Sequence, residues 1–190
     1  MPPKPRPKPP ETVAIEADDA QAMEQLVRAD PTLLQSDMGM GTMLHFAAQC
    51  GSLLVVKKLV ELGIDVNATK YPDYPEPPEG PIWNAVLGGS APVVKWLLEN
   101  GAKSDCVVPS NGEKRNISLV QAVEDGRLDL VERLVKHGAD VNVSFANQAP
   151  LSMALACDHT AIADFLRAHG ALTLDEIKAR DAKGKPKRKK

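Results

Sequence analysis

One fixed spacing between glycines recurs along this chain, and it constrains the fold more strongly than any other feature. The same interval separates Gly51 from Gly63, Gly89 from Gly101, and Gly126 from Gly138. A fourth copy runs from Asp158 to Gly170, with aspartate in place of the first glycine. A spacing that returns in this way predicts a chain built from repeated structural units.

The residues inside each interval predict a helix. In the segment 52–63, SLLVVKKLVELG, the apolar residues follow helical spacing, and a glycine stands where the helix would end. The segment 126–138, GRLDLVERLVKHG, repeats the pattern, and Lys136 and His137 fall in its last turn, where the helix dipole favours cations. Helices of about ten residues are not stable alone. Stability would therefore come from packing each repeat against its neighbours.

A second shared feature precedes each interval. We call the first residue of each interval, Gly51, Gly89, Gly126 or Asp158, the anchor of its repeat. Eight residues before these anchors stand Met43, Pro81, Ser118 and Pro150, which begin the segments MLHFAA, PIWNAV, SLVQAV and PLSMAL. Together with Thr42, the first segment reads Thr-Met-Leu-His-Phe-Ala, which resembles the Thr-Pro-Leu-His-x-Ala signature of ankyrin repeats. The amphipathic segment 18–28 begins one family period before Gly51 and resembles a less complete N-terminal copy. The resemblance covers about residues 12–172.

The resemblance implies an all-α ankyrin-repeat solenoid with an N-terminal capping helix, four helix-turn-helix repeats joined by finger loops, and a short C-terminal helix. Capping boxes would start the first helix at Asp18 and Gln21, and the last at Thr173 and Glu176. The copies are expected at about 12–36, 37–68, 78–105, 114–144 and 145–172, with the C-terminal helix at 173–180. These ranges form one domain, 12–180, between two tails expected to be disordered, the Pro/Lys-rich residues 1–11 and the basic residues 181–190.

The spacing between successive anchors is longer in two places than the family period of about 33 residues. One lies between the anchors Gly51 and Gly89, and the other between Gly89 and Gly126. By the family layout, the extra residues fall in two finger loops, between Asn67 and Gly80 and between Ala102 and Asn116. Because binding residues concentrate in loops, both fingers are expected to contact a partner.

The charges are unevenly distributed along the chain. The net charge is −2, while residues 1–10 carry +3 and residues 177–190 carry +7, so the segment 11–176 carries −12. An acidic repeat domain favours a basic partner, which its electrostatic field would attract. For the Lys/Arg-rich C-terminus, three interpretations stay open: a nuclear localisation signal, a contact with nucleic acid, or a solvated tail.

Targeting and catalytic motifs are absent from the sequence. No apolar run reaches the roughly 20 residues of a membrane span, and the N-terminal residues lack the apolar region of a secretory signal. The three cysteines form no Cys-x-x-Cys pair, which favours reduced thiols and a cytoplasmic location, or a nuclear one in a eukaryote. No Gly-x-Ser-x-Gly, P-loop, His-Glu-x-x-His or dinucleotide-binding motif occurs. We therefore expect no enzymatic activity, cofactor, metal or small-molecule substrate.

The histidines have structural interpretations, since no two of them have metal-ligand spacing. His45 matches the signature histidine, whose implied role in the family is hydrogen bonding between neighbouring loops. His137 and His169 stand in the last turn before a glycine, where they would stabilise a helix end, and His159 is expected to be exposed. Trp83 takes the signature-histidine position of the next copy, where it either packs in the core or is partly exposed.

The resemblance implies a binding face formed by the finger loops and the first helix of each repeat. The residues expected to contact a partner are Gln49, Cys50, Tyr71, Asp73, Tyr74, Glu76, Glu79, Trp83, Arg115, Asn116, Glu124 and Asp125. The two tyrosines suit an interface, because aromatic side chains are frequent hot spots and a proline-stiffened loop loses little entropy on binding. The alternative is that they are ordinary exposed side chains.

The functional expectation is a non-catalytic protein-protein interaction module that is a monomer when unbound. It would act as a stand-alone inhibitor or adaptor that binds a basic partner protein through a concave acidic face and the long fingers. One alternative is an immunity-type protein that masks a bacterial toxin, a specific case of the same class. Another is a nucleic-acid- or chromatin-associated ankyrin protein that uses the basic C-terminal tail, although the acidic domain argues against it. No membrane association is expected.

Overall fold

Short helices joined by tight turns form most of the chain in the computed structural model, which describes residues 7–39, 41–69, 80–104, 106–107, 114–115, 117–143 and 148–184. The chain divides into two compact units. The first unit contains α1 (Pro10–Glu16), α2 (Ala20–Ala29), the 3-10 helix η1 (Pro31–Gln35), α3 (Met43–Cys50), α4 (Leu53–Glu61), α5 (Pro81–Leu87) and α6 (Ala91–Glu99). The second unit contains β1 (Cys106–Val107), β2 (Lys114–Arg115), α7 (Ile117–Glu124), α8 (Leu128–Lys136), α9 (Pro150–Ala156), α10 (Thr160–Ala168) and α11 (Leu174–Gly184).

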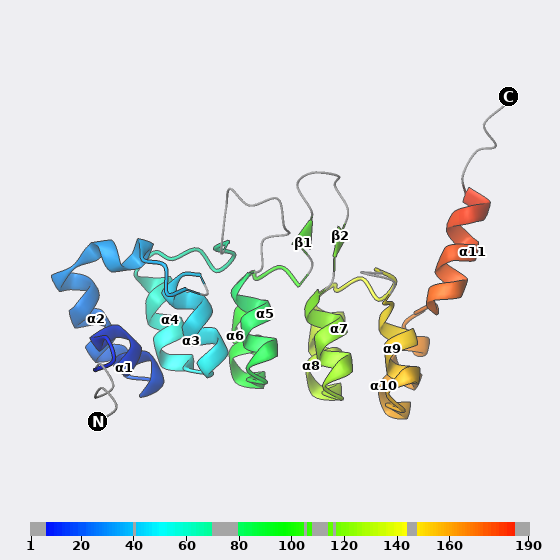
Figure 1. Ribbon diagram of the computed structural model, residues 1–190, viewed down its shortest axis with the longest axis horizontal. Helices are drawn as coiled ribbons and strands as arrows, with labels where there is room; N and C mark the ends of the chain where they lie inside the picture. The colour runs from blue at the N-terminus through cyan, green and yellow to red at the C-terminus, as the bar shows by residue number, and fades with distance from the viewer. Residues whose placement is uncertain are drawn as a thin grey trace, which may run out of the picture. The chain divides into compact units, whose positions relative to one another are not determined.

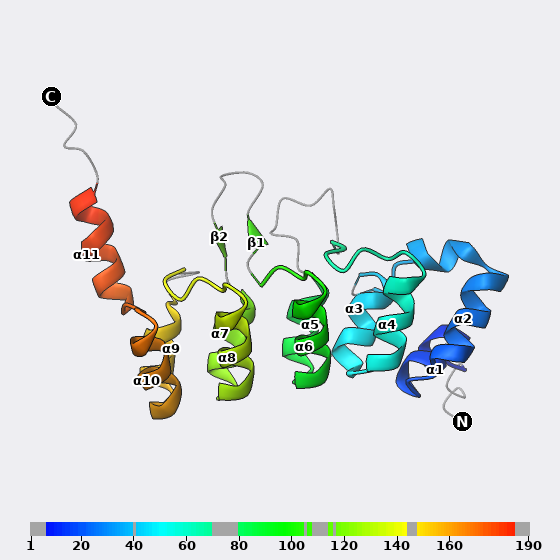
Figure 2. The ribbon, with the colours of Figure 1, turned by 180° about the vertical axis from the view of Figure 1, so that it is seen from behind.

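Consecutive helices form pairs, and the pairs stack within each unit (Figures 1 and 2). In the first unit, α3 packs against α1 and α5, while α4 packs against α2 and α6. In the second unit, α9 packs against α7, and α10 packs against α8. The predicted all-α repeat architecture is therefore confirmed. The two short strands form an antiparallel pair in the second expected finger, with Cys106 opposite Arg115.

Alanines at one position of every first helix allow this close stacking. The side chains at this position are at most 4% exposed, and they belong to Ala14, Ala47, Ala85, Ala122 and Ala154. Around them lie fully buried leucines, such as Leu44, Leu97, Leu119 and Leu134. Burying aliphatic surface between helix pairs is the main stabilising contribution, because no single pair encloses a core.

The N-terminal copy is more complete than the sequence indicates. The expected single capping helix is a pair, because α1 precedes α2 and begins at Pro10, inside the range expected to be a disordered tail. Pro10 stands eight residues before Asp18, which is the spacing of the signature proline. Asp18 adopts the left-handed φ of 50° at the position where the next three copies have glycine. The hydrophobic pattern of α1 is weak in the sequence, because this helix has seven residues and only two of them, Ala14 and Ile15, are buried.

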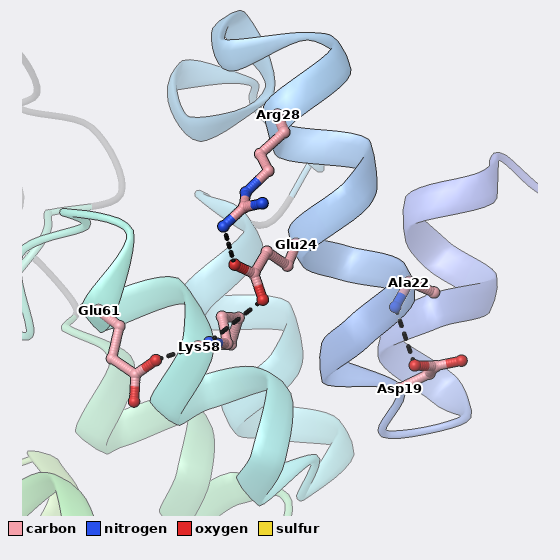
Figure 3. Close-up of polar contacts among 6 residues, drawn as sticks. All are labelled: Asp19, Ala22, Glu24, Arg28, Lys58 and Glu61. Atoms are coloured by element: carbon pink, nitrogen blue, oxygen red, sulfur yellow. Dashed lines mark hydrogen bonds and ion pairs between the residues drawn. The ribbon is translucent and has the colours of Figure 1, made fainter.

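The cap of α2 also differs by one residue from the prediction. The carboxylate of Asp19, not Asp18, accepts the backbone N–H of Ala22 at 2.9 Å (Figure 3). Asp18 instead accepts the backbone N–H of Val55 at 2.9 Å, which fastens the turn after α1 to the start of α4. A local sequence pattern cannot separate two adjacent aspartates, because either carboxylate can cap a helix.

Ion pairs on the surface of the first unit join α2 to α4 (Figure 3). Glu24 contacts Arg28 at 2.6 Å on its own helix and Lys58 at 3.4 Å on α4, while Lys58 also contacts Glu61 at 2.8 Å. Hydrogen bonds to Glu61 and Glu24 raise the pKa of Lys58. Ion pairs at a protein surface contribute little stability, so the buried aliphatic layer carries most of the stability of this unit.

The capping box predicted at the start of the last helix is present. Glu176 Oε2 accepts the backbone N–H of Thr173 at 2.7 Å and its hydroxyl at 2.8 Å, and the N–H of Glu176 donates to the Thr173 hydroxyl at 3.3 Å. The helix continues to Gly184, beyond the expected end at 180. Ile177 is buried, whereas the described side chains that follow it are exposed.

Acidification is expected to weaken this cap. The hydrogen bonds from the Thr173 backbone and hydroxyl lower the pKa of Glu176 from its ordinary value of 4.5. A lowered pKa in the folded state means that the cap contributes above the unfolded value and is lost as pH falls through the folded value. An NMR titration should give a Glu176 midpoint below 4.5, and Thr173→Ala should move it part of the way back. An unchanged midpoint in the variant would show that the hydroxyl does not bind the carboxylate in solution.

Candidate protein-binding surface

Two of the first helices in the first unit, α3 and α5, end in uncharged side chains. Gln49 and Cys50 close α3, and Leu87 closes α5. Cys50 is exposed, Gln49 is half-buried, and Leu87 is 42% exposed. Partial burial raises the pKa of the Cys50 thiol, and the charge of Glu16 raises it further. At neutral pH the thiol is therefore protonated, which suits a contact residue and not a nucleophile.

Asn84 connects these two helix ends. Its side-chain N–H donates to Gln49 Oε1 at 3.4 Å, and its side chain is 2% exposed. Asn84 Oδ1 is buried and has no hydrogen-bond partner in the part of the chain that the structure describes. The backbone of Gly88 also approaches α3, since a side chain at this position would meet the Gln49 carbonyl. We call Gln49, Cys50, Trp83, Asn84 and Leu87 the α3–α5 face.

Trp83 lies on α5 and is half-buried. This burial is intermediate between the two interpretations of its position, packing in the core and partial exposure. Its indole Nε1 is buried and has no hydrogen-bond partner among the described residues. A buried indole N–H usually finds an acceptor, and tryptophan side chains are enriched at protein interfaces. Trp83 therefore stays a candidate contact.

The corresponding helix of the second unit ends in carboxylates. Glu124 is the last residue of α7 and Asp125 follows it, and both are exposed. The Gln121 side chain donates to Asp125 Oδ1 at 3.1 Å, which orients that carboxylate. His159 donates through Nε2 to the backbone carbonyl of Glu124 at 3.2 Å. His159 is half-buried, so its expected exposure was wrong.

Several expected contact residues lie outside the described residues. They are Tyr71, Asp73, Tyr74, Glu76, Glu79 and Asn116. Arg115 lies in β2. Their part in binding stays a prediction, and so does the single groove expected to combine the first finger with Glu124 and Asp125.

The sequence matches models of known families over most of these helices. A model described as three copies of the ankyrin repeat matches residues 79–180, and a single ankyrin repeat matches residues 41–71. The chain belongs to the ankyrin-repeat family. The ankyrin-repeat matches thus include α3, α4, the helices from α5 to α10 and most of α11.

Two curated ankyrin-repeat proteins are similar to this chain. The NF-kappa-B inhibitor alpha of Gallus gallus is 32% identical over 162 residues, which are 82% of this chain and 48% of that protein. The ankyrin repeat and KH domain-containing protein mask-1 of Caenorhabditis elegans is 28% identical over 130 residues, which are 68% of this chain and 4% of that protein. The chain therefore spans about half of the first relative and a small part of the second.

Asparagines brace the ankyrin fingers within each unit. Asn67 donates through its side chain to the Gly101 carbonyl at 3.0 Å, and Asn142 donates to the Gly170 carbonyl at 3.0 Å. Asn142 also accepts the Leu172 backbone N–H at 2.8 Å. Each asparagine lies at one repeat and bonds the end of the next, so the finger bases are positioned by the stack.

The histidines of these ankyrin repeats make structural contacts. A hydrogen bond of 2.9 Å joins His45 Nδ1 to the Thr42 hydroxyl, and His45 is fully buried. His137 and His169 each donate through Nδ1, at 2.8 Å, to a backbone carbonyl four residues earlier in the chain. Among the described residues, no group of three or more His, Cys, Asp or Glu could hold a metal ion. None of the described helices is long and apolar enough to cross a membrane.

Sequence reasoning missed Asn84, Leu87 and His159. Asn84 and Leu87 stand three and six residues after the signature position at Pro81. Leu87 has the same offset as Gln49 in the preceding repeat, so a comparison of offsets between repeats would have indicated it. No local pattern indicates Asn84, because its contact with Gln49 joins two repeats. His159 follows the anchor Asp158, where Ser52 and Ser90 follow the glycine anchors of earlier repeats.

Proposed function

We propose that this chain is a non-catalytic protein-binding module that acts in the cytoplasm as an inhibitor or adaptor. The observation that carries the proposal is the exposure of the first-helix ends, at Cys50 and Leu87 in one unit and at Glu124 and Asp125 in the other. Most other side chains of these helices are buried or half-buried in the stack, so the ends are free for a partner. The relative named NF-kappa-B inhibitor alpha, aligned over 82% of this chain, supports an inhibitory role.

The partner is proposed to be basic where it meets the second unit. Glu124 and Asp125 are exposed at the end of α7, and the segment 11–176 carries −12. Exposed charges mainly accelerate association, whereas desolvated apolar contacts mainly slow dissociation. The α3–α5 face is uncharged, so it would contribute to the lifetime of the complex instead.

A nucleic-acid contact is the second candidate, and one observation favours it. Lys178, Arg180 and Lys183 of α11 are all exposed, although Arg180 pairs with Asp181 at 3.0 Å. Phosphate contacts release counterions, so such binding would fall steeply with salt. Oligonucleotide binding that disappears when all three are replaced by glutamine would favour this candidate over a basic protein partner.

Charge reversal on α7 tests the proposed function. A partner captured from the native host would be measured against Glu124→Lys and against Glu132→Lys, an exposed glutamate on α8 of the same repeat. We expect Glu124→Lys to slow association about threefold to tenfold at low salt, because it reverses a charge that faces the partner. Both variants change the net charge equally, so the matched control isolates position from total charge.

Biosensor rates at low and high salt would decide between the outcomes. The proposal predicts that the difference between the two variants shrinks at high salt, because exposed charges are then screened. Equal rates for Glu124→Lys, Glu132→Lys and the original chain would move the binding surface away from α7. Equal slowing by both variants would leave only a net-charge effect.

A further inference from the structure

An apolar groove of about 460 Å³ lies on the first helix pair, within the first unit. Its lining includes Pro10, Val13, Ala17, Ala22 and Leu26, and Asp19 is its one charged residue in the part of the chain that the structure describes. Val13, which lines the groove, is 51% exposed. The proposed binding of a partner by the first-helix ends does not use this surface.

Part of the groove corresponds to a surface that is buried in the next repeat. One repeat later, Ala14, Ala22 and Leu26 correspond to Ala47, Val55 and Leu59, and all three of these are fully buried. In that repeat, the helices α3 and α4 are covered by the preceding pair, α1 and α2. The first pair thus presents a repeat-stacking surface on the side where the following repeats have a neighbour.

The residue at position 19 argues against a further repeat in regular register. Its equivalent in the next repeat, Ser52, donates its hydroxyl to the Ile15 carbonyl of the preceding repeat at 2.6 Å. His159, at the same position, donates to the Glu124 carbonyl. The Asp19 carboxylate is acceptor-only when ionised, and it caps α2 through Ala22 (Figure 3). A carbonyl placed there by another repeat would face a negative charge.

We propose that the groove binds the same groove of a second copy of this chain, in a twofold-symmetric dimer. An isologous interface must be self-complementary, and this surface is apolar apart from Asp19 and Gln25, with the exposed side chain of Val13 in its lining. The charges suit an antiparallel arrangement of the two α1 helices. Lys8 precedes α1, while Glu16 ends it and Asp19 follows, so each basic start would meet the acidic end of the other copy.

The same charges already attract one another within one copy, where Lys8 contacts Glu16 at 2.6 Å. In the dimer, the two lysines and the acidic residues would form one shared network across the twofold axis. The surface is small in comparison with stable interfaces of about 800 Å² per partner. The dimer is therefore weak, with a dissociation constant of roughly tens of micromolar. At concentrations well below this value the chain would be a monomer, as expected from the sequence.

Sedimentation velocity of the full chain over a concentration series tests the dimer. Val13→Asp places a charge in the apolar surface and is expected to weaken dimerisation at least about tenfold. The matched control is Leu54→Asp, because Leu54 is 54% exposed on α4 of the same unit and does not line the groove. The control is expected to dimerise like the original chain. Circular dichroism would verify that both variants fold, and Val13→Ser replaces Val13→Asp if the aspartate prevents folding.

Each outcome decides the proposal. Dimerisation that is lost with the Val13 variant and kept with Leu54→Asp supports it. A chain that stays monomeric up to about 500 µM, well above the dissociation constant expected here, overturns it. Dimerisation that resists the Val13 change, or that Leu54→Asp weakens equally, shows that another surface joins the copies.

Discussion

Gly88→Ala is expected to destabilise the first unit by about 3 kcal/mol or more, close to or beyond the usual cost of overpacking. A Cβ at this position would lie 2.0 Å from the Gln49 carbonyl oxygen, which is far inside van der Waals contact. The obstacle is backbone, so no side chain can rotate away, and α3 and α5 would have to separate. Gly88 has φ −74°, a conformation in which alanine would otherwise be slightly stabilising. The steric contact therefore determines that the substitution lowers the free energy of unfolding.

The measurement is urea unfolding followed by tryptophan fluorescence. Both tryptophans, Trp83 and Trp96, lie on α5 and α6, so the signal reports the first unit. Gly80→Ala is the control, because Gly80 also has negative φ and a Cβ there meets nothing within 4 Å. We expect the control to stay within about 1 kcal/mol of the original chain. Equal stability of the two variants would mean that α3 and α5 are further apart in solution.

Leu134→Ala is the second large expected effect, and it lies in the second unit. Leu134 is fully buried on α8. Removing a buried leucine side chain costs the transfer free energy of its methyl groups and leaves a cavity, which together amount to about 2–5 kcal/mol. Repeat proteins have no distant core that could compensate, because each repeat contacts only its neighbours.

Leu155→Ala provides the matched control in the same unit. Leu155 is 46% exposed on α9, so its truncation removes little buried surface, and we expect a loss below about 1 kcal/mol. Urea unfolding monitored by far-ultraviolet circular dichroism gives the two free energies. A Leu155 variant as unstable as the Leu134 variant would indicate that the end of α9 is buried in a contact, such as a complex between copies.

The sequence alone determined the family, the helix pairs and many of their boundaries. Those signals are local: a helix period within one interval, a glycine at the helix end, and a capping box that joins residues three apart, as at Thr173 and Glu176. Such patterns predict structure because the interactions that cause them lie within one or two helical turns. Where local signals were short or ambiguous, prediction failed, as for the seven-residue α1 and for the adjacent Asp18 and Asp19.

The tertiary structure decided the contacts between repeats. Asn84 bonds Gln49, and His159 bonds the Glu124 carbonyl, each across a full repeat of sequence. No local pattern marks such pairs, because they arise when one helix pair packs on the next and brings distant positions within hydrogen-bond range. The apolar groove on α1 and α2 also follows from the packing of helix pairs and not from a local pattern. The repeat period shows which residues are equivalent, but only packing shows that one copy of an equivalent surface is left uncovered by the described residues.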